Sequence, residues 1–272
     1  MAFNLLKGKK GIIFGALDDK SIAWKAALRA HEEGASLVLT NAPIALRMGT
    51  IHELSEKVGK APVIGADATS LDDLEQLYTS AKEHFGGGID FILHSIGMSP
   101  NVRKGRKYGD LNYDWMVKAL DVSAISFHKM MQVAEKLDIM NEWGSIVGLS
   151  YIAAQRTFPD YSDMAQAKAM LESIARSYGY RYGKLKNVRV NTISQSPTVT
   201  TAGSGVGGFD TFLDYSEKMS PLGNATADDC ANYIVSLFSD LTRKVTMQNL
   251  MHDGGFSSSG MTEDLIKDLQ KK

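Results

Sequence analysis

The sequence has little cysteine, no excess of either charge and no long hydrophobic run. Its 272 residues include one cysteine, Cys230, which excludes an internal disulfide framework and a multi-cysteine metal site. Lys and Arg number 30 against 31 Asp and Glu, so the basic excess typical of nucleic-acid-binding proteins is missing. No uninterrupted apolar run is long enough to span a membrane. The histidines show no metal-ligand spacing, so we expect no metal site.

The first residues also lack the basic-then-apolar order of a secretory signal peptide. Together with the single cysteine, this predicts a cytoplasmic protein. Hydrophobic residues make up 44% of the chain, which is typical of a globular protein with a sizeable core. Since no linker or shift in composition divides the chain, we expect residues 1–272 to form a single domain.

Short apolar runs alternate with helical patterns along most of the chain. The runs lie at 11–14, 36–40, 62–67, 89–94, 144–149 and 188–193, and the helical patterns at 21–33, 44–58, 71–85, 114–137, 161–182 and 228–239. Continuous apolar runs are typical of parallel strands buried on both faces. The order predicts an α/β fold, a single-domain Rossmann-type doubly wound parallel sheet with helices on both faces. Ligands of such sheets bind at the carboxyl ends of the strands.

Two segments interrupt this alternation. Residues 98–112 are polar and basic, and residues 195–225 are rich in Gly, Ser and Thr. Both follow an expected strand, and long irregular loops in compact domains usually cover a functional site. We therefore expect a substrate lid at about 195–226.

Several residues at the expected ligand edge are candidates for binding. Gly15 ends the first run and the next helix opens near Ser21 and Ile22, a glycine turn suited to pyrophosphate or simply a strand-to-helix turn. Asp67 ends the third run, where its carboxylate could reach an adenine amine or could instead cap a helix or form a turn.

Tyr161 and Lys168 are candidates for catalysis. If both lie on the helix expected at 161–182, their spacing of seven residues places them on one face. An ammonium beside a phenol favours the ionised phenol and makes it a better acid. The alternative is a helix with an exposed lysine and a half-buried tyrosine. Tyr151 follows the fifth run and also lies at the ligand edge.

In this order, the motifs resemble the short-chain dehydrogenase/reductase superfamily, and within it the divergent branch of bacterial NADH-dependent enoyl-acyl-carrier-protein reductases. The resemblance runs from Lys9 to about Phe256 and rests on Gly15-x5-Ser21-Ile22-Ala23, His94-Ser95-Ile96-Gly97, Leu149-Ser150-Tyr151, Tyr161-x6-Lys168, Val188-Arg189-Val190-Asn191 and His252-Asp253-Gly254-Gly255. Ordinary members carry Tyr four residues and Ser seventeen residues before the lysine, where this chain has Met164 and Tyr151. This spacing disfavours the alternative, an ordinary short-chain carbonyl (3-ketoacyl) reductase.

The resemblance implies a reaction and a set of site residues. Hydride would pass from NADH to the β-carbon of a trans-2-enoyl thioester on acyl carrier protein, the last reductive step of bacterial fatty acid elongation. It implies that Tyr161 stabilises the enolate oxygen, that Lys168 holds the nicotinamide ribose and that Tyr151 is a second active-site tyrosine. Ser99 would face the acyl substrate. The implied cofactor residues are Gly15, Ser21, Ile22, Asp67, Ala68, Ile96, Lys168, Thr198, Val199, Thr200, Thr201 and Ala202.

The chain also departs from the family pattern. Residues 40–43 offer neither a carboxylate for a ribose hydroxyl nor an arginine for a 2′-phosphate, so NADPH stays an alternative to NADH. Ser196 stands where the family usually has glycine. The basic residues that meet the carrier in relatives are replaced, and we expect carrier docking at Arg103, Lys104, Arg106 and Lys107 instead.

Related enzymes are tetramers, and the resemblance implies a homotetramer here. The helices expected at 114–137 and 161–182 carry more apolar residues than one sheet face can cover, which favours an interface. These residues are Trp115, Met116, Phe127, Met130, Met131, Ile174, Tyr178 and Tyr182.

Overall fold

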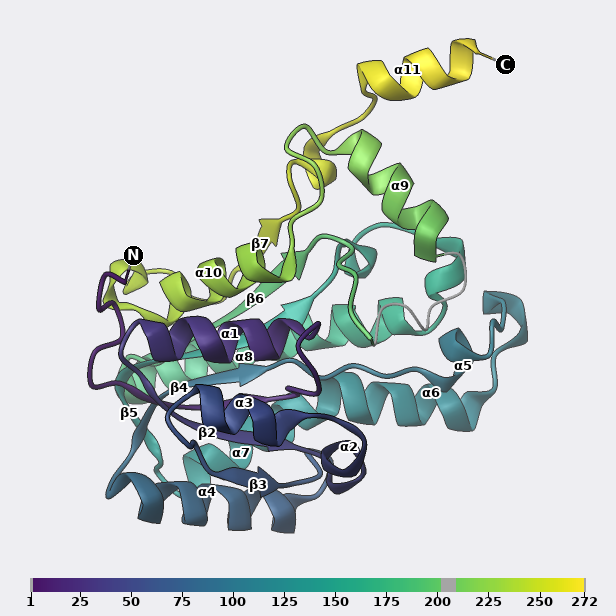
Figure 1. The fold of residues 1–272 in the computed structure, drawn as a ribbon. Coiled ribbons are helices and arrows are strands. Elements are labelled where there is room, and N and C mark those ends of the chain that lie inside the picture. The colour runs from purple at the N-terminus through teal and green to yellow at the C-terminus, as the bar shows by residue number, and fades with distance from the viewer. Residues whose placement is uncertain (1, 202–208, 272) are drawn as a thin grey trace.

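A computed structural model of the chain describes residues 2–201 and 209–271, and its centre is a seven-stranded parallel sheet (Figure 1). The strand order is β3-β2-β1-β4-β5-β6-β7, with every neighbouring pair parallel. The strands are β1 (Lys10–Phe14), β2 (Ser36–Asn41), β3 (Val63–Gly65), β4 (Ile89–His94), β5 (Met140–Ser150), β6 (Arg189–Gln195) and β7 (Asn249–His252). The predicted fold class is confirmed. The sequence reading missed β7, which has four residues and polar side chains at both ends.

Helices cover both faces of the sheet (Figure 1). They are α1 (Ile22–Glu32), α2 (Pro43–Met48), α3 (Ile51–Lys57), α4 (Leu71–Phe85), α5 (Pro100–Arg103), α6 (Tyr113–Leu120), α7 (Ser126–Lys136), α8 (Met164–Lys186), α9 (Phe209–Met219), α10 (Ala227–Phe238) and α11 (Glu263–Gln270). A π-helical turn, Asp121–Ile125, joins α6 to α7. Within the described residues, none of the helices has the length and apolarity needed to cross a bilayer.

The segments after β2 and β6 are among those that differ from the predicted elements. The helix predicted at 44–58 is two helices, because the chain breaks at Gly49 and Thr50 to let the turn after β1 approach. There the Thr50 N–H donates to Leu17 O at 2.9 Å, and a Cβ on Gly49 would lie 2.4 Å from the same oxygen. The segment predicted as irregular at 195–225 contains α9, which stands away from the sheet beside α11 (Figure 1).

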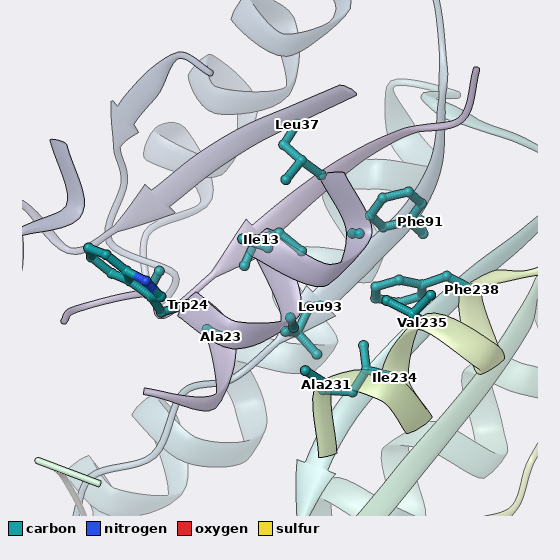
Figure 2. Close-up of a cluster of buried hydrophobic side chains, with 14 of the residues drawn as sticks. Ile13, Ala23, Trp24, Leu37, Phe91, Leu93, Ala231, Ile234, Val235 and Phe238 are labelled. Atoms are coloured by element: carbon teal, nitrogen blue, oxygen red, sulfur yellow. The ribbon is translucent and has the colours of Figure 1, made fainter. Parts of the chain in front are cut away.

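The core has one layer on each side of the sheet. On one side α1 and α10 lie next to each other and pack on β1 and β4 (Figure 2). Phe91 of β4 stacks on Phe238 of α10 with ring centroids 4.3 Å apart, and Trp24 of α1 is fully buried. Cys230 of α10 is buried in this layer, so its thiol packs in the core. On the other side α4, α7 and α8 cover the sheet.

The packing of this second layer contradicts part of the argument for the predicted homotetramer. Among the apolar residues taken as surplus, five are buried inside the protomer against the sheet: Phe127, Met130, Met131, Tyr178 and Tyr182. The two tyrosines also lie at the helix–helix contact, where Tyr182 Oη donates to Met131 O at 3.0 Å. The interface argument from these five residues was therefore wrong, because one sheet face does cover them.

Candidate active site

A cavity of about 330 Å³ lies at the carboxyl edge of the sheet. Its walls come from the start of α1 and from the segments that follow β4, β5 and β6. The register aligns these strand ends, because Ser150 pairs with Ser194 and Gln195 pairs with His252. The lining residues are Ile22, Ser95, Ile96, Gly97, Met98, Ser99, Val102, Arg103, Leu149, Ser150, Tyr151, Phe158, Pro159, Tyr161, Met164, Lys168, Gln195, Ser196, Pro197, Thr198, Thr200, Phe209 and Phe212.

The turn after β1 has the shape expected of a phosphate-binding turn. Gly15 has φ +96°, and a Cβ there would lie 2.1 Å from Ser95 O, so only glycine lets the ends of β1 and β4 approach. Ser21 caps α1 by accepting from Trp24 N at 3.3 Å. Ile22, the first residue of α1, lines the cavity. Because a helix N-terminus favours anions, this corner fits a pyrophosphate.

Three more expected cofactor residues, Ile96, Thr198 and Thr200, line the same cavity. Asp67 and Ala68 follow β3, two strands away from β1, and do not line it. The Asp67 carboxylate closes a local turn, accepting from the N–H and hydroxyl of Thr69 at 2.9 and 2.8 Å. The carboxylate therefore forms a turn, one of the alternatives that the sequence left open for Asp67.

Two further residues of the expected cofactor loop, Val199 and Thr201, are described and do not line the cavity. Val199 is exposed and does not line the cavity. The Thr201 hydroxyl donates to Asp18 Oδ2 at 2.5 Å and so joins this loop to the turn after β1. Ala202, together with residues 203–208 of the expected lid, lies outside the described residues.

Lys168 lies on α8 with its side chain buried in the cavity wall. Its Nζ donates to Leu149 O at 2.7 Å. Burial lowers the pKa of Lys168 to about 8, although the nearby Glu172 carboxylate opposes the shift. A Cβ on Gly97 would lie 3.6 Å from Nζ, so glycine there keeps the space beside the ammonium open.

Tyr161 reaches the cavity from a different element than predicted. It ends a short 3-10 turn, Pro159–Tyr161, and α8 begins only at Met164. The shared helix face was therefore wrong, because Ser162 has φ +45° and turns the chain before the helix starts. Tyr161 and Lys168 nevertheless line one cavity.

The expected ionisation of Tyr161 was also wrong. Burial raises the pKa of the Tyr161 phenol above its usual value. The Lys168 ammonium contributes no opposing shift and is bonded to a backbone carbonyl instead. The phenol is therefore neutral at physiological pH and can donate its proton in a hydrogen bond.

Tyr151 lies beside Tyr161, with ring centroids 5.1 Å apart. Its side chain is buried, and its Oη has no hydrogen-bond partner among the described residues. Burial, with the neighbouring Tyr161 and Asp253, raises the pKa of this phenol as well. A buried hydroxyl without a partner is costly unless a ligand supplies one. The cavity thus holds two neutral phenols side by side.

Aromatic residues that the sequence reading missed close the cavity near the tyrosines. Phe212 of α9 packs edge-on against Phe158 and Tyr151, with ring centroids 4.9 and 5.9 Å away. Phe209 also lines the cavity. The three-residue spacing of Phe209 and Phe212 is a helical signal that could have identified α9.

The loop after β6 is held without strain, although serine replaces glycine. Gln195 Oε1 lies 2.7 Å from His252 Nδ1, and the Gln195 amide donates to Thr198 Oγ1 at 3.1 Å. Ser196 Oγ accepts from Ala225 N at 3.1 Å. Ser196 has no positive φ, so a side chain is tolerated there. Across the described part of the chain, no group of three His, Cys, Asp or Glu residues could hold a metal ion.

Comparisons with known proteins agree with this geometry. A family model described as enoyl-(acyl carrier protein) reductase matches residues 15–257. The enoyl-(acyl-carrier-protein) reductase (NADH) FabI of Rickettsia bellii is 37% identical over 262 residues, 96% of this chain and 98% of that protein. The enoyl-(acyl-carrier-protein) reductase (NADH) 1 of Rhizobium meliloti is 33% identical over 96% of this chain and 94% of that protein. The crystal structure of a FabI-NADH complex from Alistipes finegoldii matches with TM-score 0.96 and 66% identity, covering 97% of this chain and 93% of that one.

Proposed function

The chain belongs to the enoyl-(acyl carrier protein) reductase family, and we propose that it performs this family's reaction through Tyr161, Lys168 and Tyr151. It is an NADH-dependent oxidoreductase that reduces the enoyl thioester carried by acyl carrier protein during fatty acid elongation. The observation that carries the assignment of residues is the pair of neutral tyrosines, Tyr151 buried and Tyr161 half-buried, that line one cavity together with the buried Lys168.

The residues at the carboxyl edge would hold the cofactor. The turn at Gly15 and the start of α1 at Ile22 would bind the pyrophosphate, and Lys168 would bind the nicotinamide ribose hydroxyls. The tight turn at Gly15 and the space beside Gly97 fit such a group. When bound, NADH supplies the hydride that adds to the β-carbon of the trans-2-enoyl thioester.

Tyr161 would stabilise the negative charge that develops on the thioester oxygen. Its neutral phenol donates a hydrogen bond, and a preorganised donor of this kind contributes about 2.7–4 kcal/mol to transition-state stabilisation. Tyr151, whose Oη lacks a partner among the described residues, would be a second donor toward the substrate. Phe158 and Phe212 would exclude water from the acyl half of the cavity.

A spectrophotometric assay tests this assignment. NADH oxidation is followed with crotonyl thioester and, in parallel, with acetoacetyl thioester. We expect turnover of the enoyl substrate only, and the spacing of Tyr151 and Lys168 disfavours the ketone. Faster reduction of the acetoacetyl thioester would instead support an ordinary carbonyl reductase. Repeating the assay with NADPH measures the cofactor preference.

We also propose that the carrier docks at the basic segment after β4. Arg103 lines the cavity, and Lys104 beside it is exposed. Arg106 is paired with Asp110 and lies over the Trp115 ring, so it is held at this surface. Charge reversal by Lys104→Glu should raise KM for carrier-bound substrate but not for a short pantetheine thioester. Equal KM changes for both substrates would contradict this docking surface.

Three further proposals concern the organisation of the protein. Residues 1–272 would form one catalytic domain, and residues 195–226 its substrate lid, since Thr198, Phe209 and Phe212 all line the cavity. The protein would assemble as a homotetramer through α6 and α8, where apolar side chains remain exposed. It would act in the cytoplasm, where its one thiol, Cys230, stays reduced.

A further inference from the structure

The side chain of Asp163 is fully buried between the Tyr161 turn and the segment that follows β4. It accepts two hydrogen bonds, from Ser99 Oγ to Oδ1 at 2.6 Å and from Asn101 Nδ2 to Oδ2 at 2.7 Å. Over residues 2–201 and 209–271, no salt bridge involves this carboxylate. Burying a carboxylate among neutral donors costs free energy, so its contribution is not simply stability.

Both donors to Asp163 organise the segment after β4. Ser99 caps α5, because its Oγ also accepts from Val102 N at 3.1 Å. The Asn101 amide donates to Asn112 O, and Asn101 Oδ1 accepts from Asn112 N, each at 3.0 Å. The bonds between Asn101 and Asn112 thus close residues 99–112 into a loop, and Asp163 holds the start of this loop through Ser99 and Asn101.

Asp163 also stands where the catalytic turn enters α8. Tyr161 lies two residues before it, and Ser162 between them has φ +45° and a buried Oγ without a partner among the described residues. The hydroxyl of Ser162 thus makes no hydrogen bond within the described residues, whereas the Asp163 carboxylate joins the end of this turn to Ser99 and Asn101. Met164 on one side and Ser99 on the other both line the cavity.

We propose that Asp163 is a positioning residue that holds Tyr161 at a fixed distance from the cavity wall formed by Ser99 and Val102. This inference rests on the proposed function, because it assigns Tyr161 the role of hydrogen-bond donor to the substrate. Asp163 does not line the cavity and would act through its two hydrogen bonds. Loss of these bonds would let the phenol and the wall move apart, and small misplacements of reacting groups reduce kcat strongly.

Three variants separate the hydrogen bonds from the charge. Asp163→Ala leaves the Ser99 hydroxyl and the Asn101 amide without their acceptor. Asp163→Asn removes the charge but can still join both groups, donating to Ser99 Oγ and accepting from Asn101. Ser99→Ala removes one bond only. The matched control is Asp90→Ala, because Asp90, which is half-buried, also accepts from an asparagine amide, that of Asn141, but lies at the amino end of β4, away from the cavity.

Two measurements carry the test. Hydrogen–deuterium exchange of residues 98–112 reports whether the hydrogen bonds to Asp163 stabilise this segment. We expect faster exchange in Asp163→Ala but not in Asp163→Asn. Steady-state kinetics report its consequence. We expect Asp163→Ala to lower kcat about tenfold to a hundredfold with NADH affinity unchanged, Ser99→Ala to lower it less, and Asp163→Asn to recover most of the loss.

Several outcomes would overturn the proposal. Wild-type kcat in Asp163→Ala would remove the positioning role, and equal losses in Asp163→Asn and Asp163→Ala would assign the effect to charge. A parallel loss in Asp90→Ala would indicate general destabilisation. If Asp163→Ala does not fold, Ser99→Ala decides, and an unchanged kcat there counts against the proposal. A wild-type protein without enoyl reductase activity would contradict the proposed function. The hydrogen–deuterium exchange result would still show whether Asp163 stabilises residues 98–112.

Discussion

Burial sets the protonation state of each candidate catalytic residue. The pKa values of Tyr151 and Tyr161 rise because the charged phenolate is poorly solvated in the cavity wall. The pKa of Lys168 falls to about 8 for the same reason. Near neutral pH the cavity therefore holds two neutral hydrogen-bond donors and a mostly charged ammonium. This combination suits the stabilisation of an enolate oxygen and the binding of ribose hydroxyls.

Removing the Tyr161 hydroxyl should affect turnover far more than cofactor binding. In Tyr161→Phe we expect kcat to fall about 10²–10³-fold, because the hydrogen bond forms mainly in the transition state. The Kd for NADH, measured by fluorescence, should stay the same. If kcat stays near the wild-type value, another group must stabilise the oxyanion. Tyr151→Phe then identifies whether that group is the neighbouring phenol.

NADH affinity should depend on pH through Lys168. The ammonium is charged below its pKa of about 8 and loses its charge as the pH rises through that value. A hydrogen bond to a charged group contributes about 1.5–3 kcal/mol, so the Kd for NADH should rise about tenfold or more above pH 8. Calorimetry between pH 6 and about 10 measures this profile.

The Glu172 carboxylate raises the pKa of Lys168, and its removal should shift the profile. Glu172→Gln keeps a hydrogen-bonding group for Ser150 and Gln155 but removes the charge. The rise in Kd should then begin at lower pH. Glu75→Gln, which disrupts an exposed ion pair with Lys136, is the control and should not move the profile. An unshifted profile in Glu172→Gln would mean that Lys168 does not control the affinity.

At the level of elements, hydrophobic patterns predicted most strands and helices but not where chain turns interrupt them. The pattern at 71–85 predicted α4 correctly, since Ser70 caps the helix and Gly86 ends it in the left-handed conformation. The pattern at 161–182 hid the turn at Ser162, because a positive φ in a serine leaves no signal in the sequence. The Tyr161–Lys168 pair was thus recognised by its spacing but placed on the wrong element.

Helix α9 should determine affinity for the acyl chain. Phe212→Ala removes a ring that packs on Phe158 and Tyr151, and full burial of such a side chain contributes about 1.5–3 kcal/mol. We expect KM for a long enoyl thioester to rise about tenfold or more with little change in kcat. Tyr215→Ala is the control, because Tyr215 lies on α9 outside the cavity lining. If Phe212→Ala and Tyr215→Ala have the same KM, α9 does not contribute to binding of the acyl chain.

At the scale of the whole molecule, the sequence predicted the ligand edge better than the cavity wall. Parallel strands bring all their carboxyl ends together, so the segments that follow them were expected at one edge, and the family resemblance then assigned Ile22, Lys168 and Thr198 to a site there. The aromatic wall from α9 could not be assigned, because it depends on how a helix beyond the sheet folds back. The hydrogen bonds of Asp163 with Ser99 and Asn101 were missed for a related reason, since they join two loops whose geometry the strand order does not determine.

Exposed apolar side chains on α6 and α8 still favour the proposed homotetramer. Tyr113 and Val117 of α6 are 77% and 66% exposed, and Tyr180 and Leu185 of α8 are 62% and 55% exposed. Tyr113 and Val117 lie one turn apart on one face of α6, and such a face gains free energy when a second copy covers it. Closed symmetric assemblies meet this need without open edges.

Light scattering tests the assembly directly. We expect a species of four times the chain mass at micromolar concentration. Val117→Asp should shift the protein to smaller species, because a desolvated carboxylate at an interface is strongly unfavourable. Leu241→Asp, at an equally exposed site after α10, should leave the mass unchanged. A wild-type monomer would contradict the tetramer, and a tetramer that survives Val117→Asp would place its interface away from α6.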